Sequence, residues 1–410
     1  MNYRDVVEIL KVSQDRPARD ERFDTFKRAV SFYGVQPTSE VILVAGTNGK
    51  GTVSATLAKL LGGNVGLFTS PHLIEPTERI STNGRDLEPS ELVRAYELIE
   101  ETVRKFDLSH FEILTLMMIE VFWGGRIRPP VDHAVVEVGV GGRLDPTRVI
   151  PHSTAVIARI GMDHEAILGH TLSAIAREKL AIAEDAERLI YMKPQSELQS
   201  VFDEARSLYA PCEFIEALPF DSAVGREPGS GVPVWSVQTP WGEAPLALKG
   251  ARAVENTSLA LEVMNALGAP IELNRLREVK WPGRMECIRE RVYFSGDHNE
   301  QGVESLREIL AHFDYETLWL VVGIGKGKPA EAMLEHYRKI PRAKIILTKT
   351  YFRQISDPEF AQLNGDLKID DAYEALQQAL AQAKPKDLVV VSGSLYLVGD
   401  LKRLMSERSR

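Results

Sequence analysis

The sequence feature that most constrains the fold is residues 41–61, VILVAGTNGKGTVSATLAKLL. Five apolar residues suited to a buried strand lead into a turn with three glycines, and an apolar pattern at helical spacing follows. This order is typical of a phosphate-binding loop, because the turn lets backbone N–H groups approach an anion at the positive end of the helix dipole. We therefore expect a nucleotide-binding α/β protein. The alternative is a glycine-rich turn that binds nothing.

Charged and hydroxyl side chains complete this loop. Lys50 adds a mobile positive charge for the outer phosphates, and the hydroxyl of Thr52 is placed to hold a magnesium ion. The spacing departs from the standard Walker pattern, which has glycine at position 44 and Ser or Thr directly after the lysine, whereas this chain has Val44 and Gly51. The residues expected to contact phosphate, mostly through inward-pointing amides, are Gly46, Thr47, Asn48, Gly49, Lys50, Gly51 and Thr52.

The length and composition indicate a folded protein of more than one domain. Of the 410 residues, 44% are apolar and 26% are charged, and about two to three domains fit this length. The net charge of -9 argues against nucleic acid as a partner, because such binding rests on a basic face. The two cysteines lie far apart and predict no disulfide framework, and neither a secretory leader nor a run of about 18 apolar residues is evident. We expect a cytoplasmic protein that binds no membrane.

Polar side chains after later strands are candidates for the same site, because ligands of an open parallel sheet lie beyond the carboxyl ends of its strands. Ser70 follows one short strand. Glu137 comes near the end of another, among four valines, which favours a buried acid that holds magnesium over a solvent-facing one. His164 follows the expected strand at 154–162, although a lone histidine there can be an ordinary loop residue.

Two further segments carry weaker signals. Lys179 lies on an expected helix next to Glu178, and by itself this pattern indicates a solvated pair on the surface. Residues 71–86 are rich in Pro, Thr, Asn and Gly, and a stretch of this length is typical of a mobile substrate loop.

The order of strands and helices divides the chain near residue 290. Residues 1–290 are expected to form a P-loop-type domain with a central, mostly parallel sheet, preceded by short helices at Tyr3–Val12 and Phe23–Tyr33. From there strands and helices alternate again at the spacing of a parallel sheet, which predicts a smaller Rossmann-like α/β domain over 291–410. The cleft between the two domains is the expected place of reaction.

Several stretches together resemble one family of enzymes. They span both expected domains, and they occur in the same order as in folylpolyglutamate synthase and dihydrofolate synthase, members of the Mur ligase superfamily of ATP-dependent amide ligases. As a set they are highly specific. The matching stretches are VAGTNGKGT (44–52), TSPHL (69–73), ERI (78–80), VEVGVGGRLD (136–145), Asp163-His164, IAREK (175–179), WPGR (281–284), His298-Asn299 and SGSLYLVG (392–399).

The resemblance implies a role for each matching residue. Lys50 and the loop amides would bind the phosphates of ATP, with Thr52 at the first Mg²⁺. Lys179 matches a family lysine that carbon dioxide carbamylates, which turns a cation into an anion able to hold a second Mg²⁺. The residues implied to complete the metal shell are Ser70, Glu137 and His164, and those implied to lie at the nucleotide are Asn256, Arg284 and His298.

The reaction so implied has two steps. The acceptor carboxylate attacks the γ-phosphate of ATP to give an acyl phosphate, and the amine of glutamate then attacks that carbonyl. The acceptors implied are dihydropteroate, a reduced folate, or both. The protein's part would be positioning and charge stabilisation. We expect a monomer that acts on these small molecules with ATP and Mg²⁺.

The chain departs from the family pattern where the acceptor would bind. After TSPHL the family has Arg-Phe-Asn, with an aromatic ring suited to stacking on a pterin, and residues 75–77 here are Glu-Pro-Thr. After GGRLD the family has Ala-Thr-Asn, and residues 146–148 are Pro-Thr-Arg. In the second domain, Asp-Gly-Ala-His-Asn-Pro has become Ser-Gly-Asp-His-Asn-Glu at 295–300, where Asp297 is expected to replace the lost acid at the nucleotide.

Three functions follow from these observations. The first is a folate-type glutamate ligase. The second is the same chemistry on a different acceptor carboxylate, which Glu75, Pro76 and Arg148 favour. The third is a catalytically silent nucleotide-binding regulator, and the retention of the metal-binding set argues against it, because binding alone needs only the phosphate loop.

Overall fold

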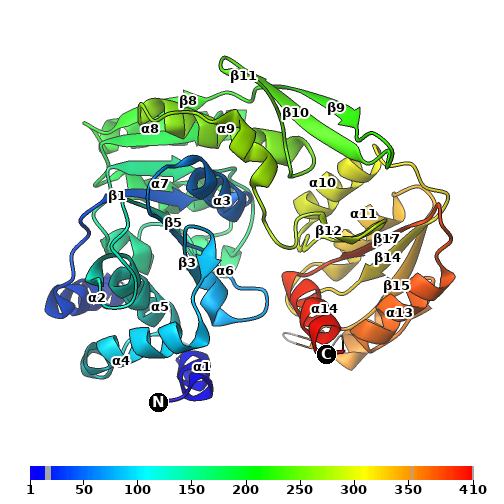
Figure 1. Cartoon of the computed structure of the whole chain (residues 1–410), viewed down its shortest axis with the longest axis horizontal. Coiled ribbons are helices and arrows are strands. Elements are labelled where there is room, and N and C mark those ends of the chain that lie inside the picture. The colour runs from blue at the N-terminus through cyan, green and yellow to red at the C-terminus, as the bar shows by residue number, and fades with distance from the viewer. Residues whose placement is uncertain (14–19, 352–353, 409–410) are drawn as a thin grey trace. The chain divides into compact units, whose positions relative to one another are not determined.

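The structure is a computed structural model, and it describes residues 1–13, 20–351 and 354–408. The described chain forms two compact units, both drawn in Figure 1. The domain boundary predicted near residue 290 stays a prediction. The compact units are divided at a different place, since the strand Glu286–Arg289 pairs with the C-terminal sheet and belongs to the second unit. The first unit comprises Met1–Phe220, Thr239–Gly242 and Glu255–Val279, and the second comprises Asp221–Gln238, Glu243–Val254 and Lys280–Arg410.

A mostly parallel sheet of eight strands forms the centre of the first unit, in the order β4-β3-β2-β5-β1-β6-β7-β8. The antiparallel pairs lie at one edge, where β3 pairs with β2 on one side and with β4 on the other. The middle residues of the central strands are apolar and buried, as expected where helices shield both faces of a parallel sheet from water. This confirms the predicted α/β class. The strands are β1 (Glu40–Ala45), β2 (Val65–Phe68), β3 (Ile80–Thr82), β4 (Arg85–Asp86), β5 (His133–Glu137), β6 (Thr154–Ile157), β7 (Arg188–Met192) and β8 (Glu213–Ala217).

The helices of the first unit mostly begin and end where the apolar spacing predicts. The first helix occupies the predicted residues because Asn2 and Asp5 form a capping box at its start. Helix α5 ends at Ile119, and the chain continues as a π-helical turn, Glu120–Gly124. The helices are α1 (Tyr3–Val12), α2 (Asp20–Tyr33), α3 (Lys50–Leu60), α4 (Pro89–Phe106), α5 (His110–Ile119), α6 (Glu165–Leu168), α7 (Leu172–Leu180), α8 (Gln199–Leu208) and α9 (Ala251–Ala266).

Residues 76–86, most of the stretch predicted to be a mobile loop, have regular structure. They contain a short 3-10 helix, η1 (Pro76–Arg79), followed by the hairpin of β3 and β4. Glu78 shapes the start of this segment, because its carboxylate accepts hydrogen bonds from the amides of residues 73–75 at 2.8–2.9 Å. The Glu78 side chain therefore fixes the backbone at the start of the segment.

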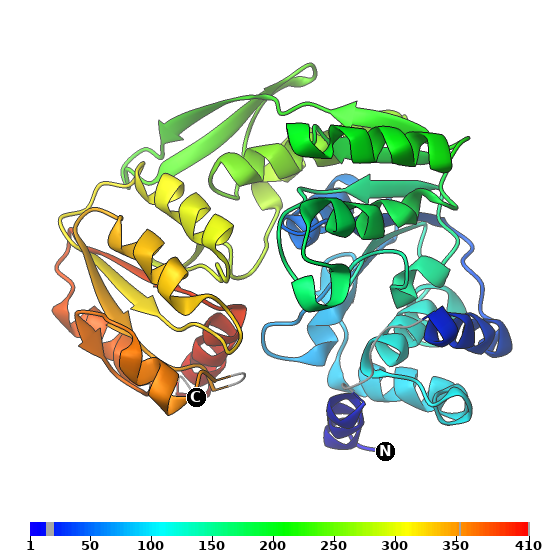
Figure 2. The same cartoon turned by 180° about the vertical axis from the view of Figure 1, so that it is seen from behind.

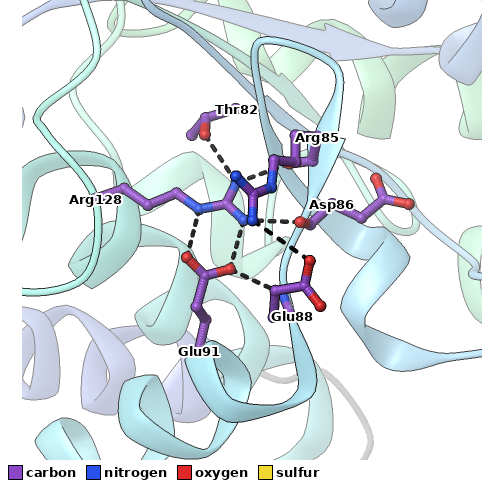
Figure 3. Close-up of polar contacts among 6 residues, drawn as sticks. All are labelled: Thr82, Arg85, Asp86, Glu88, Glu91 and Arg128. Carbon is purple, nitrogen blue, oxygen red and sulfur yellow. Dashed lines mark hydrogen bonds and ion pairs between the residues drawn. The ribbon is translucent and has the colours of Figure 1, made fainter.

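Arg128 fastens the same hairpin to α4 (Figure 3). Its side chain is almost fully buried. One terminal nitrogen donates to the Thr82 hydroxyl at 2.8 Å and to the Arg85 carbonyl at 2.7 Å, and the other donates to the Asp86 carbonyl at 2.7 Å. Nε and the second terminal nitrogen also bind the carboxylate of Glu91, on α4, in the paired geometry that makes arginine–carboxylate contacts strong. These hydrogen bonds lower the pKa of Glu91.

Replacing Arg128 with methionine is expected to lower the free energy of unfolding by about 2–3 kcal/mol, because the carbonyls of the hairpin and the carboxylate of Glu91 lose their donor. Urea unfolding measures the loss. Arg85→Met is the matched control, since that side chain is exposed and its ion pair with Glu88 contributes less than about 1 kcal/mol. Equal losses in the two variants would contradict a structural role for Arg128.

The second unit contains a six-stranded sheet in the order β12-β13-β17-β14-β15-β16, parallel except for β12. Helices α10 and α11 lie together on one face, in front in Figure 2, and α13 and α14 lie on the other. This is the alternating α/β pattern that the sequence predicts. The elements are β12 (Glu286–Arg289), β13 (Val292–Phe294), α10 (Glu300–Leu310), β14 (Leu318–Val322), α11 (Ala330–Arg338), β15 (Ala343–Leu347), α12 (Asp357–Gln362), β16 (Leu367–Lys368), α13 (Ala372–Gln382), β17 (Leu388–Ser392) and α14 (Leu395–Arg408).

A separate three-stranded sheet comes before this unit's main sheet in the chain, in the order β11-β10-β9. Its strands are β9 (Asp221–Arg226), β10 (Pro233–Thr239) and β11 (Gly242–Pro245). All six residues of β9 are exposed, so no apolar alternation marks it in the sequence. Among the described residues, no helix combines the length and the apolar character needed to cross a bilayer.

Candidate active site

The phosphate loop begins where β1 ends, and the ends of two neighbouring strands lie beside it. Val44 on β1 is paired with Glu137 on β5, and Ala45 is paired with Ile157 on β6. These strands are parallel, so their carboxyl ends meet at one edge of the sheet. The topology therefore places the loop and the residues that follow β5 and β6 together, as the sequence predicts.

Two glycines of the loop have backbone conformations that other residues rarely adopt. Gly46 has a φ of +145°, and a Cβ there would lie 2.9 Å from the Cβ of Ala158. Gly49 has a φ of +95°, and a Cβ there would collide with the side chain of Asn256. Asn256 is buried on α9. The structure thus brings this predicted nucleotide-site residue against the phosphate loop.

The first two amides of the loop do not point inward as predicted. Thr47 and Asn48 donate their N–H groups to the carbonyl of Arg159, at 2.9 and 3.2 Å. The Thr47 hydroxyl also binds the backbone of Gly161, so both residues attach the loop to the segment that follows β6. Helix α3 starts at Lys50 without a side-chain cap among the described residues. Its first-turn amides, Lys50–Thr52, are therefore the ones placed to bind an anion.

Glu137 and Ser70 meet at the same edge of the sheet. The Glu137 side chain is 3% exposed, so the solvent-facing alternative is wrong. One of its carboxylate oxygens accepts a hydrogen bond from the Ser70 amide at 3.0 Å. The buried Thr52 lies in the first turn of α3, one strand away. A carboxylate and two hydroxyl oxygens are ligands that Mg²⁺ prefers, so these residues fit the implied ion.

The described residues contain no group of three or more His, Cys, Asp or Glu side chains placed to hold a metal. A magnesium ion there would therefore depend on hydroxyl, phosphate and water oxygens as well as Glu137. This is the usual situation for Mg²⁺, which keeps several waters and binds through one or two carboxylates together with substrate phosphates.

Lys179 is a buried residue of the site and not half of a surface pair. It is 4% exposed, and its Nζ donates to the carbonyl of Gly46 at 2.9 Å. Its neighbour Glu178 instead pairs with Arg143 at 3.0 Å. Burial, and then the charge of Lys50, lower the pKa of Lys179 to about 7, against the pull of nearby carboxylates such as Asp163. A large share of this amine is therefore neutral, and nucleophilic, at physiological pH.

His164 lies farther along the chain from its strand than predicted. Strand β6 ends at Ile157, and His164 is the N-cap residue of α6 with a φ of +52°. Its side chain is 48% exposed, with Nε2 3.9 Å from a carboxylate oxygen of Asp163. Its role as a metal ligand stays a prediction.

Three predicted nucleotide-site residues of the second unit gather around Gly296. The guanidinium of Arg284 donates to the Gly296 carbonyl at 3.3 Å, and His298 Nδ1 lies 3.1 Å from the same oxygen. Burial raises the pKa of Asp297, while the charge of Arg284 and hydrogen bonds from Ser295 and Ser392 oppose this. Asp297 therefore interacts electrostatically with Arg284, and its role as a replacement for the lost family acid stays a prediction.

Sequence reasoning missed the pair formed by His72 and Arg79, although both belong to matching stretches. The Nε of Arg79, which is buried, donates to His72 Nδ1 at 2.8 Å. Burial, then the charges of Arg79 and His110, lower the pKa of His72 to about 3. His110 has a pKa lowered to about 4, again chiefly by burial. The signal that could have found this pair is the presence of both residues on one loop, seven positions apart.

Arg148 does not face the acceptor loop, so it gives no support to a changed acceptor. Its guanidinium pairs with Glu184 and lies 5.7 Å from the centre of the Phe23 ring. It lines a cavity of about 550 Å³ with Ser39 and Glu40, at the start of β1. This is the amino end of the sheet, and the phosphate loop lies at the opposite end of the same strand.

Comparisons with known proteins cover both units. Residues 283–395 match the family model of the Mur ligase glutamate ligase domain. The chain is 28% identical over 389 residues to a probable bifunctional folylpolyglutamate synthase/dihydropteroate synthase of Haloferax volcanii, with 88% of this chain but only 45% of that protein aligned. It is 32% identical over 336 residues to the dihydrofolate synthase/folylpolyglutamate synthase of Mycobacterium tuberculosis, with 72% of this chain and 67% of that protein aligned. The structure of Mycobacterium tuberculosis folylpolyglutamate synthase complexed with ADP is similar with a TM-score of 0.86 and 27% identity, over 98% of each chain.

Proposed function

Because the chain belongs to the dihydrofolate synthase/folylpolyglutamate synthase family, we propose that it is an ATP-dependent ligase that joins glutamate to a carboxylate acceptor through an acyl phosphate. The acceptor is dihydropteroate, a reduced folate, or both. The observation that carries the proposal is the meeting of three features at one sheet edge: the phosphate loop, the buried Glu137 held by Ser70, and the buried Lys179 on the carbonyl of Gly46. A nucleotide-binding regulator would need only the first.

In this proposal the residues of the loop position the phosphates and offset their charge. The first-turn amides of α3 bind phosphate oxygens, and the Lys50 ammonium stabilises the negative charge that develops as the γ-phosphate is transferred. Thr52, Ser70, Glu137 and His164 supply the protein ligands for magnesium. Magnesium bound there would polarise the phosphoryl group and neutralise its oxygens.

The buried Lys179 acts after carbamylation. The ammonium group first loses one proton. The neutral amine then attacks the carbon of CO₂, an N–C bond forms as one C=O π bond opens, and a second proton leaves, so the original cation has become a carbamate anion. The lowered pKa of Lys179 provides the neutral amine this step needs. The carbamate oxygens would then serve a second magnesium ion. The proposed nucleotide contacts of the second unit are Arg284, Asp297 and His298, and those of the first unit include Asn256.

One observation favours a second candidate, the same ligation on a non-folate acceptor. The positions where the family carries a stacking aromatic are filled by Glu75, Pro76 and Thr77. Glu75 accepts a hydrogen bond from the Tyr3 hydroxyl at 2.6 Å, while Pro76 and Thr77 are buried within the segment. No aromatic ring is offered at these three positions, so a flat heterocycle loses that contact.

A turnover assay separates the candidates. Purified protein is incubated with ATP, Mg²⁺ and glutamate, together with dihydropteroate, a reduced folate or a panel of other carboxylic acids. The folate proposal predicts ADP release and a glutamyl conjugate with at least one pterin, and little ADP without an acceptor. Conjugates only with non-pterin acids would support the second candidate. The proposal also takes the enzyme to be a cytoplasmic monomer, which sedimentation and cell fractionation can check.

A further inference from the structure

The hydrogen bond between Arg79 and His72 fixes where the histidine carries its proton. An arginine Nε–H can donate but never accept, so His72 Nδ1, 2.8 Å away, must offer its lone pair. A histidine with a lone pair on Nδ1 is neutral and carries its hydrogen on Nε2. The side chain is therefore held in one tautomer, with a single N–H donor at the far end of the ring.

The surroundings keep this arrangement in place. Arg79 is 8% exposed and is the last residue of η1. The backbone that leads into η1 is held by the Glu78 carboxylate, which accepts hydrogen bonds from the amides of residues 73–75. His110, at the start of α5, interacts with both groups, and its own Nδ1 is 2.8 Å from the carbonyl of Leu10. A carbonyl only accepts, so His110 Nδ1 carries a hydrogen.

The donor end of His72 remains available. The ring is partly exposed, and no described residue accepts a hydrogen bond from its Nε2. Its place in the fold is beside the proposed reaction site, because Ser70, two residues earlier, donates its amide to Glu137. An available donor of fixed direction at such a position is suited to hold a substrate oxygen.

We propose that His72 donates a hydrogen bond from Nε2 to an oxygen on the body of the carboxylate acceptor, and that Arg79 is the positioning residue that sets its tautomer. The inference rests on the proposed function and adds the group that orients the acceptor. In this chain the loop recognises the acceptor by a hydrogen bond where the family's stacking aromatic is missing. Because the contact is made to bound substrate before and during reaction alike, its loss raises KM for the acceptor and leaves kcat unchanged.

Two substitutions at position 72 separate the donor from the contact with Arg79. In His72→Asn the side-chain oxygen occupies the position of Nδ1 and still accepts from Arg79, but no N–H reaches the place of Nε2. In His72→Gln the amide nitrogen reaches that place, while the contact with Arg79 is lost. We expect KM for the acceptor to rise about 5–10-fold in His72→Asn, the loss of one hydrogen bond, and less than about threefold in His72→Gln. KM for ATP and for glutamate should not change in either.

The reverse order of the two variants, or an equal shift in KM for ATP, would show that the histidine only supports the loop and would overturn the inference. Wild-type values in both variants would overturn it too. If the wild-type enzyme shows no ligation with any acceptor, the proposed function fails, and this inference fails with it. Long-range ¹H–¹⁵N spectra of histidine-labelled protein give a readout besides activity: the Nε2–H tautomer is expected for His72 in the wild type, and the Nδ1–H tautomer or a protonated ring would contradict it.

Discussion

Replacing Lys50 with alanine is expected to lower kcat for ligation by about 10³-fold, with little change in stability. The ammonium group lies at the first turn of α3, 3.4 Å from the Thr47 carbonyl of its own loop. That contact keeps the ammonium at the loop whose first-turn amides are proposed to bind phosphate. A preorganised charge that faces developing negative charge typically contributes two to three orders of magnitude. ADP release at saturating ATP and acceptor measures kcat, and urea unfolding measures stability.

Lys59→Ala is the matched control for this variant, because it removes the same charge from the same helix. Lys59 lies in the last turn of α3, where its side chain is 40% exposed and pairs with Glu278. We expect kcat within about twofold of the wild type and a loss in stability below about 1 kcal/mol. Full activity of Lys50→Ala, or an equal fall in both variants, would mean that Lys50 does not act on the phosphates.

The phosphate loop and the parallel strands could be predicted because their signals are local. Gly46 and Gly49 mark backbone conformations with positive φ, and short apolar runs bounded by turns specify buried strands. Helix α1 agrees with its prediction because the Asn2–Asp5 capping box fixes its start within the sequence itself. The position of Glu137 beside the loop could be predicted in the same way, because the carboxyl ends of the parallel strands β1 and β5 lie at the same edge of the sheet.

Contacts between distant parts of the chain could not be predicted in this way. A lysine beside a glutamate on a helix has the pattern of a surface pair, yet the partner of Lys179 is the carbonyl of Gly46, 133 residues earlier. The edge hairpin looked like a loop because the side chain that holds it, Arg128, comes 43 residues after Arg85. The side-chain orientation of Arg148 could not be predicted either, because its ion-pair partner, Glu184, comes from a separate segment of the chain. In each case the deciding interaction was tertiary, and it outweighed the local pattern.

Replacing Lys179 with methionine is expected to lower kcat by about 10²–10³-fold, because the proposed carbamate and its metal-holding oxygens are lost. Methionine has a similar volume and no charge, so the buried space stays filled. The same proposal predicts that removing dissolved CO₂ lowers the activity of the wild type and that bicarbonate restores it. Steady-state assays in degassed and bicarbonate-supplemented buffers measure both effects, and the mass of the intact protein reports the carbamate.

The lowered pKa also predicts how Lys179 affects stability with pH when CO₂ is absent. The unfolded chain holds this proton up to its ordinary pKa of 10.5, and the folded chain only up to about 7. Between these values the unfolded state binds more protons, so the stability of the wild type relative to Lys179→Met rises with pH. Below pH 7 the buried charge destabilises the fold fully. The expected gain from pH 6 to pH 9 is about 2–3 kcal/mol, measured as the difference in urea unfolding between the two proteins.

Arg177→Met provides the control, because Arg177 lies on the same helix but is exposed and paired with Glu204. An arginine keeps its proton across this range, so the stability difference between that variant and the wild type should not change with pH. If the difference for Lys179→Met were equally flat, the lysine would keep its proton in the fold, and it could not react with CO₂ at neutral pH. If the stability difference did not change with pH and the activity did not depend on CO₂, Lys179 would be a buried cation that only binds the carbonyl of Gly46. A second magnesium ion would then have to be held by other ligands.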